Sequence, residues 1–303
     1  MKWPFDPRHL RTLEAVSRLR SFAAAGEELG FTQSAVSQQI AELERRVGTP
    51  VVTRRPVRLT EAGQVLLTTE TAITVSMSAA ATELAALADG SVGLLRLGAF
   101  ISAATSLVPP ALAQVRAAHP GVRLVLREME QGETHAALLR GDLDLAITFD
   151  YTHAVRTPPR GIREDHLIDD PILIVLPEDH PLATRHEVGL HDVPSQEWIT
   201  TNVSLDLGVA DLDVHAEQPV IPAALDFEGQ DFRTALSLVA TGLGVALLPR
   251  LALHHAPPGV TARPVAPIPM VRRIHTARLD TRRTPRAVQH LRTALQQAAS
   301  ALG

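Results

Sequence analysis

The chain has 303 residues, a formal net charge of −4 and no cysteine. This length accommodates two or three domains, and the lack of cysteine excludes disulfides, thiolate metal sites and a thiol nucleophile. The first residues lack the apolar run of a secretory signal. No window approaches the about 18 to 20 apolar residues of a membrane span, so we expect a soluble, cytoplasmic protein without a membrane partner.

Positive charge is concentrated near the N-terminus. Residues 1–63 contain ten Lys or Arg and seven Asp or Glu, a net of +3, whereas the rest contains 19 basic and 26 acidic side chains, a net of −7. Contact with nucleic-acid phosphates requires this kind of positive segment. The bias is mild, and taken alone it is weak evidence for a nucleic-acid partner.

Three helices are predicted in the first 47 residues. The first runs from about Asp6 to Leu19, and Ser21 and Thr32 are suitable N-caps for the second and third. Gly30 tolerates the left-handed conformation that ends the second helix. The apolar residues of the first helix and of the third recur at helical spacing and predict buried stripes: Leu10, Leu13, Val16 and Leu19, then Val36, Ile40, Leu43 and Val47.

The opposite face of the third helix is short and polar. Such side chains suit hydrogen bonds to the edges of bases, and two helices joined by a tight turn form the layout of a helix-turn-helix. The alternative is a pair of ordinary amphipathic helices in an all-α core. The residues of this face are Gln33, Ser34, Ser37, Gln38, Ala41 and Arg45.

A short two-stranded wing is predicted next. Arg54, Arg55 and Arg58 surround Pro56, and three guanidinium groups so close together favour a polyanionic partner. Arg45 and Arg46 end the third helix, where a solvated helix end is as good an explanation as DNA contact.

A long helix is predicted from Thr60 to about Asp89-Gly90. Its apolar residues form a narrow seam that favours pairing with a second copy of the chain, and the alternative is that the seam packs on the chain's own C-terminal domain. The seam consists of Leu66, Ile73, Met77, Ala80, Leu84 and Leu87.

Alternating strands and helices follow, which predicts an α/β domain with a parallel, doubly wound sheet. The first unit contains strands at 94–98, 122–128 and 143–148 and helices at 103–118 and 133–140. The second unit contains strands at 172–176, 198–201 and 242–249 and a helix at 230–241. The chain is expected to return to the first unit around 264–269 and to end with a strand at 273–279 and a helix at 285–300, which makes two lobes.

Several other motifs carry no function by themselves. Gly242-Leu243-Gly244 follows a helix and lacks the third glycine of a dinucleotide site, so we interpret it as a helix end and strand start. The thirteen histidines share no element that would arrange metal ligands, and surface histidines are the commoner explanation. No nucleophile elbow supports a hydrolase. We therefore expect no metal, no catalytic residues and no cofactor.

Ligands of open α/β sheets collect at the carboxyl ends of strands, and helix N-termini there attract anions. For any single residue at these ends, a cap or a turn is an equally good explanation. The candidates for contact with a small molecule are Ile101, Ser102, Thr201, Asn202 and Phe227.

The N-terminal segment resembles a known family. The match covers SFAAAGEELGFTQSAVSQQIAELERRVGTPVV and the following VRLTEAG, and it is similar to the DNA-binding domain of LysR-type transcriptional regulators. The run from Arg140 to Ile147, in the α/β part of the chain, also has close counterparts at the same point in this family. Where the family usually has Leu-Phe and a longer wing, this chain has Val51-Val52 and a short path to Val57, so we expect a short wing.

The resemblance and the pattern together predict an α/β fold class with an N-terminal all-α winged helix-turn-helix (1–59), a long linker and dimerisation helix (60–90) and a two-lobed effector domain (91–303) like periplasmic solute-binding proteins. Lobe 1 is predicted at about 91–160 and 266–303, and lobe 2 at about 161–265. The predicted function is transcription regulation through double-stranded DNA at an inverted repeat, modulated by a small-molecule co-inducer of unknown identity. A homodimer or homotetramer is expected, and RNA polymerase is a further candidate partner.

Seven residues are predicted to contact DNA. Thr32 would cap the recognition helix, Gln33 would bond adenine directly, and Ser37 would contact phosphate. The remaining candidates are Ser34, Gln38, Arg54 and Arg58. The rival hypotheses are a small-molecule-binding module that does not touch DNA and an α/β enzyme whose cleft performs chemistry.

Overall fold

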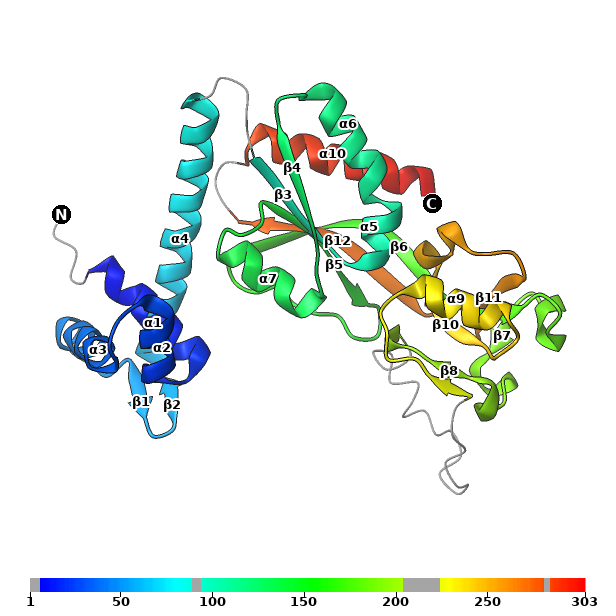
Figure 1. Cartoon of the computed structure of the whole chain (residues 1–303), viewed down its shortest axis with the longest axis horizontal. Helices are drawn as coiled ribbons and strands as arrows, with labels where there is room; N and C mark the ends of the chain where they lie inside the picture. Colours follow the sequence, from blue (N-terminus) through cyan, green and yellow to red (C-terminus); the bar gives the residue numbers. More distant parts are fainter. Residues whose placement is uncertain (1–5, 89–93, 204–223, 281–283, 303) are drawn as a thin grey trace. The chain divides into compact units, whose positions relative to one another are not determined.

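A computed structural model of the chain describes residues 6–88, 94–203, 224–280 and 284–302. The chain divides into an N-terminal compact unit that extends to Leu84 and a C-terminal unit that begins at Ala85. Figure 1 shows their helices and strands. Each unit has its own hydrophobic core.

The N-terminal unit is a small helical domain with a two-stranded wing, as the sequence predicted. Its elements are α1 (Pro7–Leu19), α2 (Phe22–Leu29), α3 (Gln33–Val47), β1 (Val52–Arg54), β2 (Val57–Leu59) and α4 (Glu61–Ala88). All four helices contribute to one core, which includes Leu10, Leu13, Val16, Ala25, Val36, Ile40, Leu43 and Leu66. Leu19 and Val47, also predicted to be buried, are partly exposed at the edge of this core.

The apolar seam of α4 is divided between two environments. Leu66 is buried in the N-terminal core and Ile73 packs against it, so the first part of the predicted seam is covered within the unit. Met77, by contrast, is 69% exposed. The side chains of Leu84 and Leu87, and the predicted helix end at Asp89-Gly90, lie outside what the structure describes.

The C-terminal unit is built on a mixed sheet with the strand order β4-β3-β5-β12-β6-β11-β7, and β10 also pairs with β6. The predicted parallel part is present, because β3 pairs in parallel with both β4 and β5. In chain order the first strands are β3 (Leu94–Ala99), β4 (Arg123–Glu128), β5 (Leu145–Tyr151) and β6 (Ile162–Pro177), and β12 (Val271–Leu279) returns between β5 and β6.

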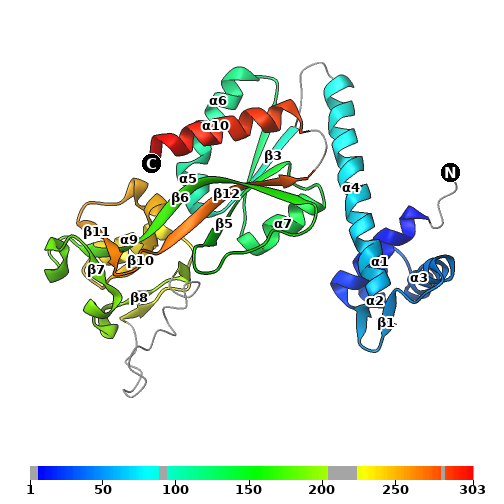
Figure 2. The ribbon, with the colours of Figure 1, turned by 180° about the vertical axis from the view of Figure 1, so that it is seen from behind.

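Helices cover both faces of the first lobe. On one face lie α5 (Ile101–Ser106), α6 (Val108–Ala118) and α10 (Arg286–Leu302), and α7 (Gln131–Leu139) lies on the other (Figures 1 and 2). The core under α5, α6 and α10 includes Leu95, Leu97, Leu107, Val115, Leu145, Ile147, Ile274, Leu291 and Leu295. This layering is what the alternation of strands and helices predicted.

The second lobe has two apolar cores, distinct from the core under α5, α6 and α10. The second half of β6 pairs with β10 (Ala246–Pro249) and β11 (Val260–Ala266), whereas its first half pairs with β12. The other elements are the 3-10 helices η1 (Pro181–Thr184), η2 (Leu190–Asp192), η3 (Ser195–Glu197) and η5 (Arg250–His255), the short strands β7 (Val188–Gly189), β8 (Ile199–Thr200) and β9 (Leu225–Asp226), and α9 (Phe232–Ala240). The predicted two-lobed fold is therefore confirmed, with β6 carrying the chain from one lobe to the other.

The single helix predicted at 103–118 is wrong. The chain forms α5 and α6, which are separate helices that meet at Leu107. Pro109 and Pro110 follow at the start of α6. Because proline has no backbone N–H, neither residue can continue the hydrogen-bond ladder of α5, while both are tolerated in the first turn of a new helix.

Several predicted strands had wrong bounds, and three of the differences have a local cause. The strand expected at 172–176 is only the second half of β6, whose first half carries charged residues and lacks a continuous apolar run. The strand expected at 143–148 begins two residues later, at Leu145. Asp144 lies just before it, and its carboxylate accepts the Arg96 N–H and pairs with the Arg96 guanidinium. The strand expected at 242–249 begins at Ala246. Gly242 has φ +76° and its N–H donates to the Val239 carbonyl, so this residue closes the end of α9 and is not part of the strand.

Candidate nucleic-acid interface and effector site

Three local devices fix the turn between α2 and α3. The Ser21 Oγ accepts the Ala24 N–H at 3.2 Å, and the Thr32 Oγ1 accepts the Ala35 N–H at 3.2 Å, so both helices are capped as predicted. Gly30 adopts φ +71° between them. The sequence reasoning missed Gly26, where an added Cβ would lie 2.7 Å from the Phe31 carbonyl oxygen. Only glycine permits this close approach of the turn.

The two faces of α3 differ completely in exposure. Val36, Ile40 and Leu43 are fully buried. Opposite them, Gln33, Ser34 and Gln38 are exposed and Ser37 is half-buried. The side chains of Gln33 and Gln38 make no hydrogen bond to any described residue, whereas Ser34 lies 2.9 Å from the Thr32 hydroxyl. The predicted DNA-contact residues of α3 therefore lie together on one outward face with unused donors and acceptors.

The arginines near α3 are more restrained than the sequence suggested. Arg45 and Arg46 both pair with Glu42 of the same helix, which offsets their charge. Arg54 lies over the ring of Phe22, 5.6 Å from its centroid, and this contact ties the wing to the start of α2. Arg58, opposite Thr53 in the wing register, is exposed. Phe22 was not recognised from the sequence because a first-turn phenylalanine is indistinguishable from a core residue.

The five predicted effector contacts form two groups in the C-terminal unit. Ile101 and Ser102 occupy the first turn of α5, after β3. Thr201, Asn202 and Phe227 follow β8 and β9, which pair in parallel and bring these residues together. No hydrogen bond between described residues joins one group to the other.

Two of these five residues already have internal roles. Ser102 is 1% exposed, and its Oγ accepts a hydrogen bond from Arg272 Nη2 at 2.8 Å. Thr201 is also buried, and its Oγ1 donates to the Leu247 carbonyl at 3.3 Å. Ile101, Asn202 and Phe227 are partly exposed and are the more accessible members.

A buried ion pair lies where the two long strands β6 and β12 run together. Arg272 Nη2 is 2.6 Å from Asp170 Oδ2, and these side chains are only 3% and 1% exposed. The second oxygen of Asp170 accepts the Leu251 N–H at 3.0 Å. The guanidinium also lies 4.7 Å from the Phe100 ring centroid and 4.9 Å from that of Phe149.

This network joins α5 and the strands β6 and β12 to η5, the segment that follows β10 of the second lobe and whose Leu251 packs in the first-lobe core. Sequence reasoning missed this network, and no local signal marks it. Arg272 is followed by a second arginine in β12, and its partner lies 102 positions away in the chain.

Titratable groups gather on the face of the first lobe that α7 covers. Asp150 accepts hydrogen bonds from Arg273 at 2.9 and 2.7 Å and from His275 at 3.3 Å. Burial alone would raise the pKa of Asp150, but these donors outweigh burial and the pKa is lowered. Glu164 behaves in the same way: burial opposes its charge, and hydrogen bonds from His135 and Thr148, both at 2.8 Å, lower its pKa.

A hydrogen bond also crosses between the lobes at their surface. Gln230, just before α9, donates to Glu130, just after β4. Among the described residues, no group of three or more His, Cys, Asp or Glu is arranged to hold a metal ion. No helix in the described ranges is long and apolar enough to cross a membrane.

A capped helix-turn-helix with a polar outer face, joined to a two-lobed α/β domain, defines a DNA-binding protein with a ligand-binding domain. A family model described as "Bacterial regulatory helix-turn-helix protein, lysR family" matches residues 7–64, and one described as "LysR substrate binding domain" matches residues 88–300. The chain therefore belongs to the LysR family of DNA-binding transcriptional regulators, which are not enzymes.

Individual relatives agree with this family. YnfL of Escherichia coli K12, named as an uncharacterized transcriptional regulator, is 31% identical over 248 residues, which cover 80% of this chain and 81% of YnfL. MetR of Salmonella typhimurium is 30% identical over 246 residues, covering 80% of this chain and 74% of MetR.

Solved structures share the fold. Full-length LysG of Corynebacterium glutamicum, with bound effector Arg, superposes with a TM-score of 0.62 at 23% identity over 98% of this chain and 99% of LysG. Full-length BenM gives a TM-score of 0.57 at 22% identity over 98% of this chain and 97% of BenM.

Proposed function

We propose that this regulator binds an inverted-repeat promoter site as a homodimer or a dimer of dimers, with α3 entering the major groove. The observation that carries this proposal is the division of α3 into a fully buried apolar stripe and an exposed polar face with unused hydrogen-bonding groups. A helix of this kind, held by two caps and a glycine turn, is preorganised for base contact.

Within this interface the residues have different roles. Gln33 contacts an adenine edge through its amide, and Ser34, Ser37 and Gln38 contact neighbouring bases or phosphates. Thr32 acts by capping α3. Arg58 contacts the phosphates of the DNA backbone from the wing. Arg54 contacts them from its position above the ring of Phe22.

A small-molecule effector binds between the lobes, near Ile101, Ser102, Thr201, Asn202 and Phe227. Because the buried Arg272 connects Ser102 to Asp170 and through it to η5, an occupant near α5 favours one angle between the lobes over another. That angle sets the spacing of two recognition helices in a dimer. We propose no metal and no resident cofactor, because the proposed response needs only differential binding of the effector.

The proposed organisation follows the sequence boundaries, with a DNA-binding domain at 1–59, a linker helix at 60–90 and an effector domain from 91. Beyond Ile73 the linker helix exposes Met77 and Ala80, which supports self-association along α4. The site of action is the cytoplasm, since that compartment holds bacterial promoters, and RNA polymerase is the natural further partner of such a regulator.

The test is binding of the full chain to the intergenic DNA upstream of its own gene, by gel shift and footprinting with non-specific competitor. We expect two protected half-sites related by a dyad and an affinity that falls steeply with salt. Binding that competitor abolishes, at this DNA and in a genome-wide selection of bound fragments, would contradict the proposal.

A further inference from the structure

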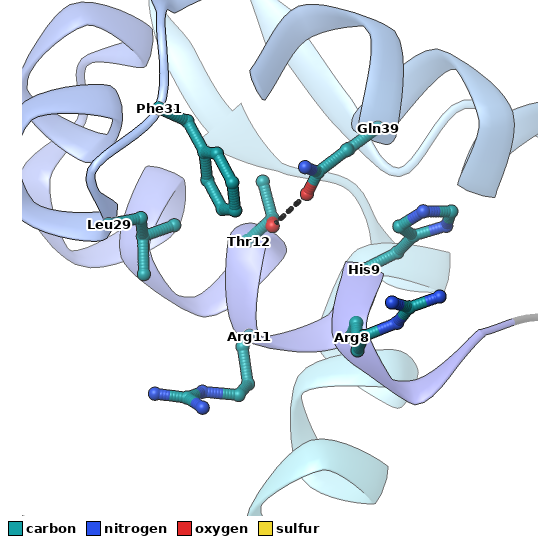
Figure 3. Close-up of a pocket in the computed structure, with 7 residues that line it drawn as sticks. All are labelled: Arg8, His9, Arg11, Thr12, Leu29, Phe31 and Gln39. Carbon is teal, nitrogen blue, oxygen red and sulfur yellow. Dashed lines mark hydrogen bonds between the residues drawn. The ribbon is translucent and has the colours of Figure 1, made fainter. Parts of the chain in front are cut away.

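A hollow of about 490 Å³ lies in the N-terminal unit, between α1, the end of α2 and the inner side of α3. The proposed DNA-contact residues of α3 are not among its lining residues. Figure 3 shows those that line it: Arg8, His9, Arg11, Thr12, Leu29, Phe31 and Gln39.

Hydrogen bonding leaves an unused donor at its centre. Thr12 is 1% exposed, and its Oγ1 donates to Gln39 Oε1 at 2.5 Å. Because this bond occupies the amide oxygen, the Gln39 side chain can offer its Nε2 group to an occupant. That amide nitrogen makes no hydrogen bond to any described residue.

Three basic residues, Arg8, His9 and Arg11, are among the residues that line the hollow, and no carboxylate is. Arg8 is held by Asp6, 2.7 Å away, and this hydrogen bond lowers the pKa of Asp6 to about 2. Arg11 makes no ion pair with any residue that the structure describes. His9 is half-buried, and its Nδ1 has no hydrogen-bond partner among the described atoms. The polar lining therefore favours an anion.

The opposite wall is apolar. Leu29 ends α2, and Phe31 in the turn is 49% exposed, so its ring is accessible to an occupant. In Figure 3, Leu29 and Phe31 lie on one side, Arg8 and His9 on the other, and the Thr12–Gln39 pair between them. An occupant that satisfies both walls has an apolar body and a negative group.

We propose that this hollow binds a small carboxylate with an aromatic or aliphatic body. The volume is in the range of metabolite-sized sites, which are concave and mostly apolar with a few placed polar groups. A DNA phosphate would engage the arginines but leave Leu29 and Phe31 uncovered, so a metabolite matches the lining better. This ligand site is separate from the effector site proposed in the C-terminal unit.

The site acts on the recognition helix directly. Gln39 belongs to α3, and Phe31 immediately precedes Thr32, the cap of α3. An occupant that fits one position of α3 better than another changes DNA affinity, and DNA changes ligand affinity by the same factor. This coupling rests on the proposed DNA-binding function, whereas ligand binding itself does not.

The test uses 2-naphthoate as the probe and its neutral analogue 2-naphthamide as the control, titrated into the full chain. Methyl-labelled leucines are followed by NMR, and the Leu29 signals are assigned by their loss in Leu29→Ile. We expect the Leu29 signals to move saturably with naphthoate and much less with the amide. Arg11→Glu should weaken this affinity about tenfold, and Phe31→Ser should weaken it similarly, while Arg116→Glu, an exposed change on α6, leaves it unchanged.

Unmoved Leu29 signals at millimolar naphthoate, equal responses to the acid and the amide, or equal effects of Arg11→Glu and Arg116→Glu would overturn the site. The coupling is tested by repeating the titration with the footprinted DNA. A naphthoate affinity that changes at least about twofold, matched by the same change in DNA affinity, supports it; no change overturns the coupling. Failure to bind any DNA would contradict the proposed function while the Leu29 shifts still decide the site.

Discussion

The outer face of α3 and the junction between β6 and β12 both carry polar side chains, but these side chains differ in exposure and in hydrogen bonding. Gln33 and Gln38 are exposed and bond no described residue, while Arg272 and Asp170 are almost fully buried, pair with each other, and bond Ser102 and the Leu251 N–H respectively. Unused polar groups on a rigid helix serve an external partner. Buried charges that pair with each other stabilise the fold where β6 and β12 run together.

The largest effect is expected at the junction. Asp170→Ala leaves the Arg272 guanidinium buried without a counter-charge, which should lower the free energy of unfolding of the C-terminal unit by about 3–5 kcal/mol. Denaturant unfolding measures this loss. The control is the neighbouring Asp169→Ala: that side chain is 63% exposed, so its change should stay within about 0.5 kcal/mol. Equal effects of the two variants would mean that the buried pair has no special importance.

The outer face of α3 should show the reverse pattern. Gln33→Ala together with Ser37→Ala should lower specific DNA affinity about 10- to 100-fold, since each good base contact is worth about 1–3 kcal/mol. The free energy of unfolding should change little, because neither side chain bonds a described residue. Gel shift and thermal unfolding measure the two quantities, and Gln297→Ala on the exposed face of α10 is the control. If the double variant unfolds more easily yet binds DNA normally, these two side chains stabilise the fold and do not contact DNA.

The turn before α3 offers a test of preorganisation. Gly26→Ala places a Cβ 2.7 Å from the Phe31 carbonyl oxygen, so we expect the N-terminal unit to lose about 1–3 kcal/mol of stability and DNA binding to weaken with it. Gly132→Ala in α7 is the matched control, because nothing lies within 4 Å of its added Cβ. Equal losses of stability in thermal unfolding of the two variants would show that the turn moves to accommodate the added Cβ without cost.

The smallest effect concerns pH. The pKa of Glu164 is lowered below its ordinary value of 4.5, so its contribution to stability is fully present above that value and is lost as pH falls through the lower, folded-state pKa. Glu164→Gln should therefore flatten the dependence of unfolding free energy on pH below 4.5. Denaturant unfolding at a series of acidic pH values checks this. An unchanged slope in the variant would assign the acid sensitivity to other carboxylates.

Local signals explain how far the sequence could predict this molecule. The caps Ser21 and Thr32, the glycine at 30 and the apolar stripe of α3 are encoded within a few residues of each other, so the helix-turn-helix was predictable. The division of 103–118 was missed because helical periodicity outweighed the two prolines. The Arg272–Asp170 pair could not be found, since its members meet only through the return of β12 beside β6.

The predicted site residues also divide into those that local sequence determines and those that depend on long-range contacts. The outward residues of α3 follow from helix geometry, because burial of one stripe fixes the position of every other side chain. In the effector domain, strand ends indicated the neighbourhood but not the direction of each side chain. Ser102 and Thr201 are turned inward to Arg272 and the Leu247 carbonyl. The hollow beside Phe31 depends on three separate helices and has no sequence signature.

The central claim is that the outward face of α3 reads a specific DNA sequence. Its most direct test is footprinting of the full chain on its own upstream intergenic DNA, comparing wild type with the Gln33→Ala, Ser37→Ala double variant at several salt concentrations. We predict a protected inverted repeat for the wild type and, for the double variant, loss of that protection with residual binding that still falls with salt. Identical footprints for the two proteins would contradict the claim.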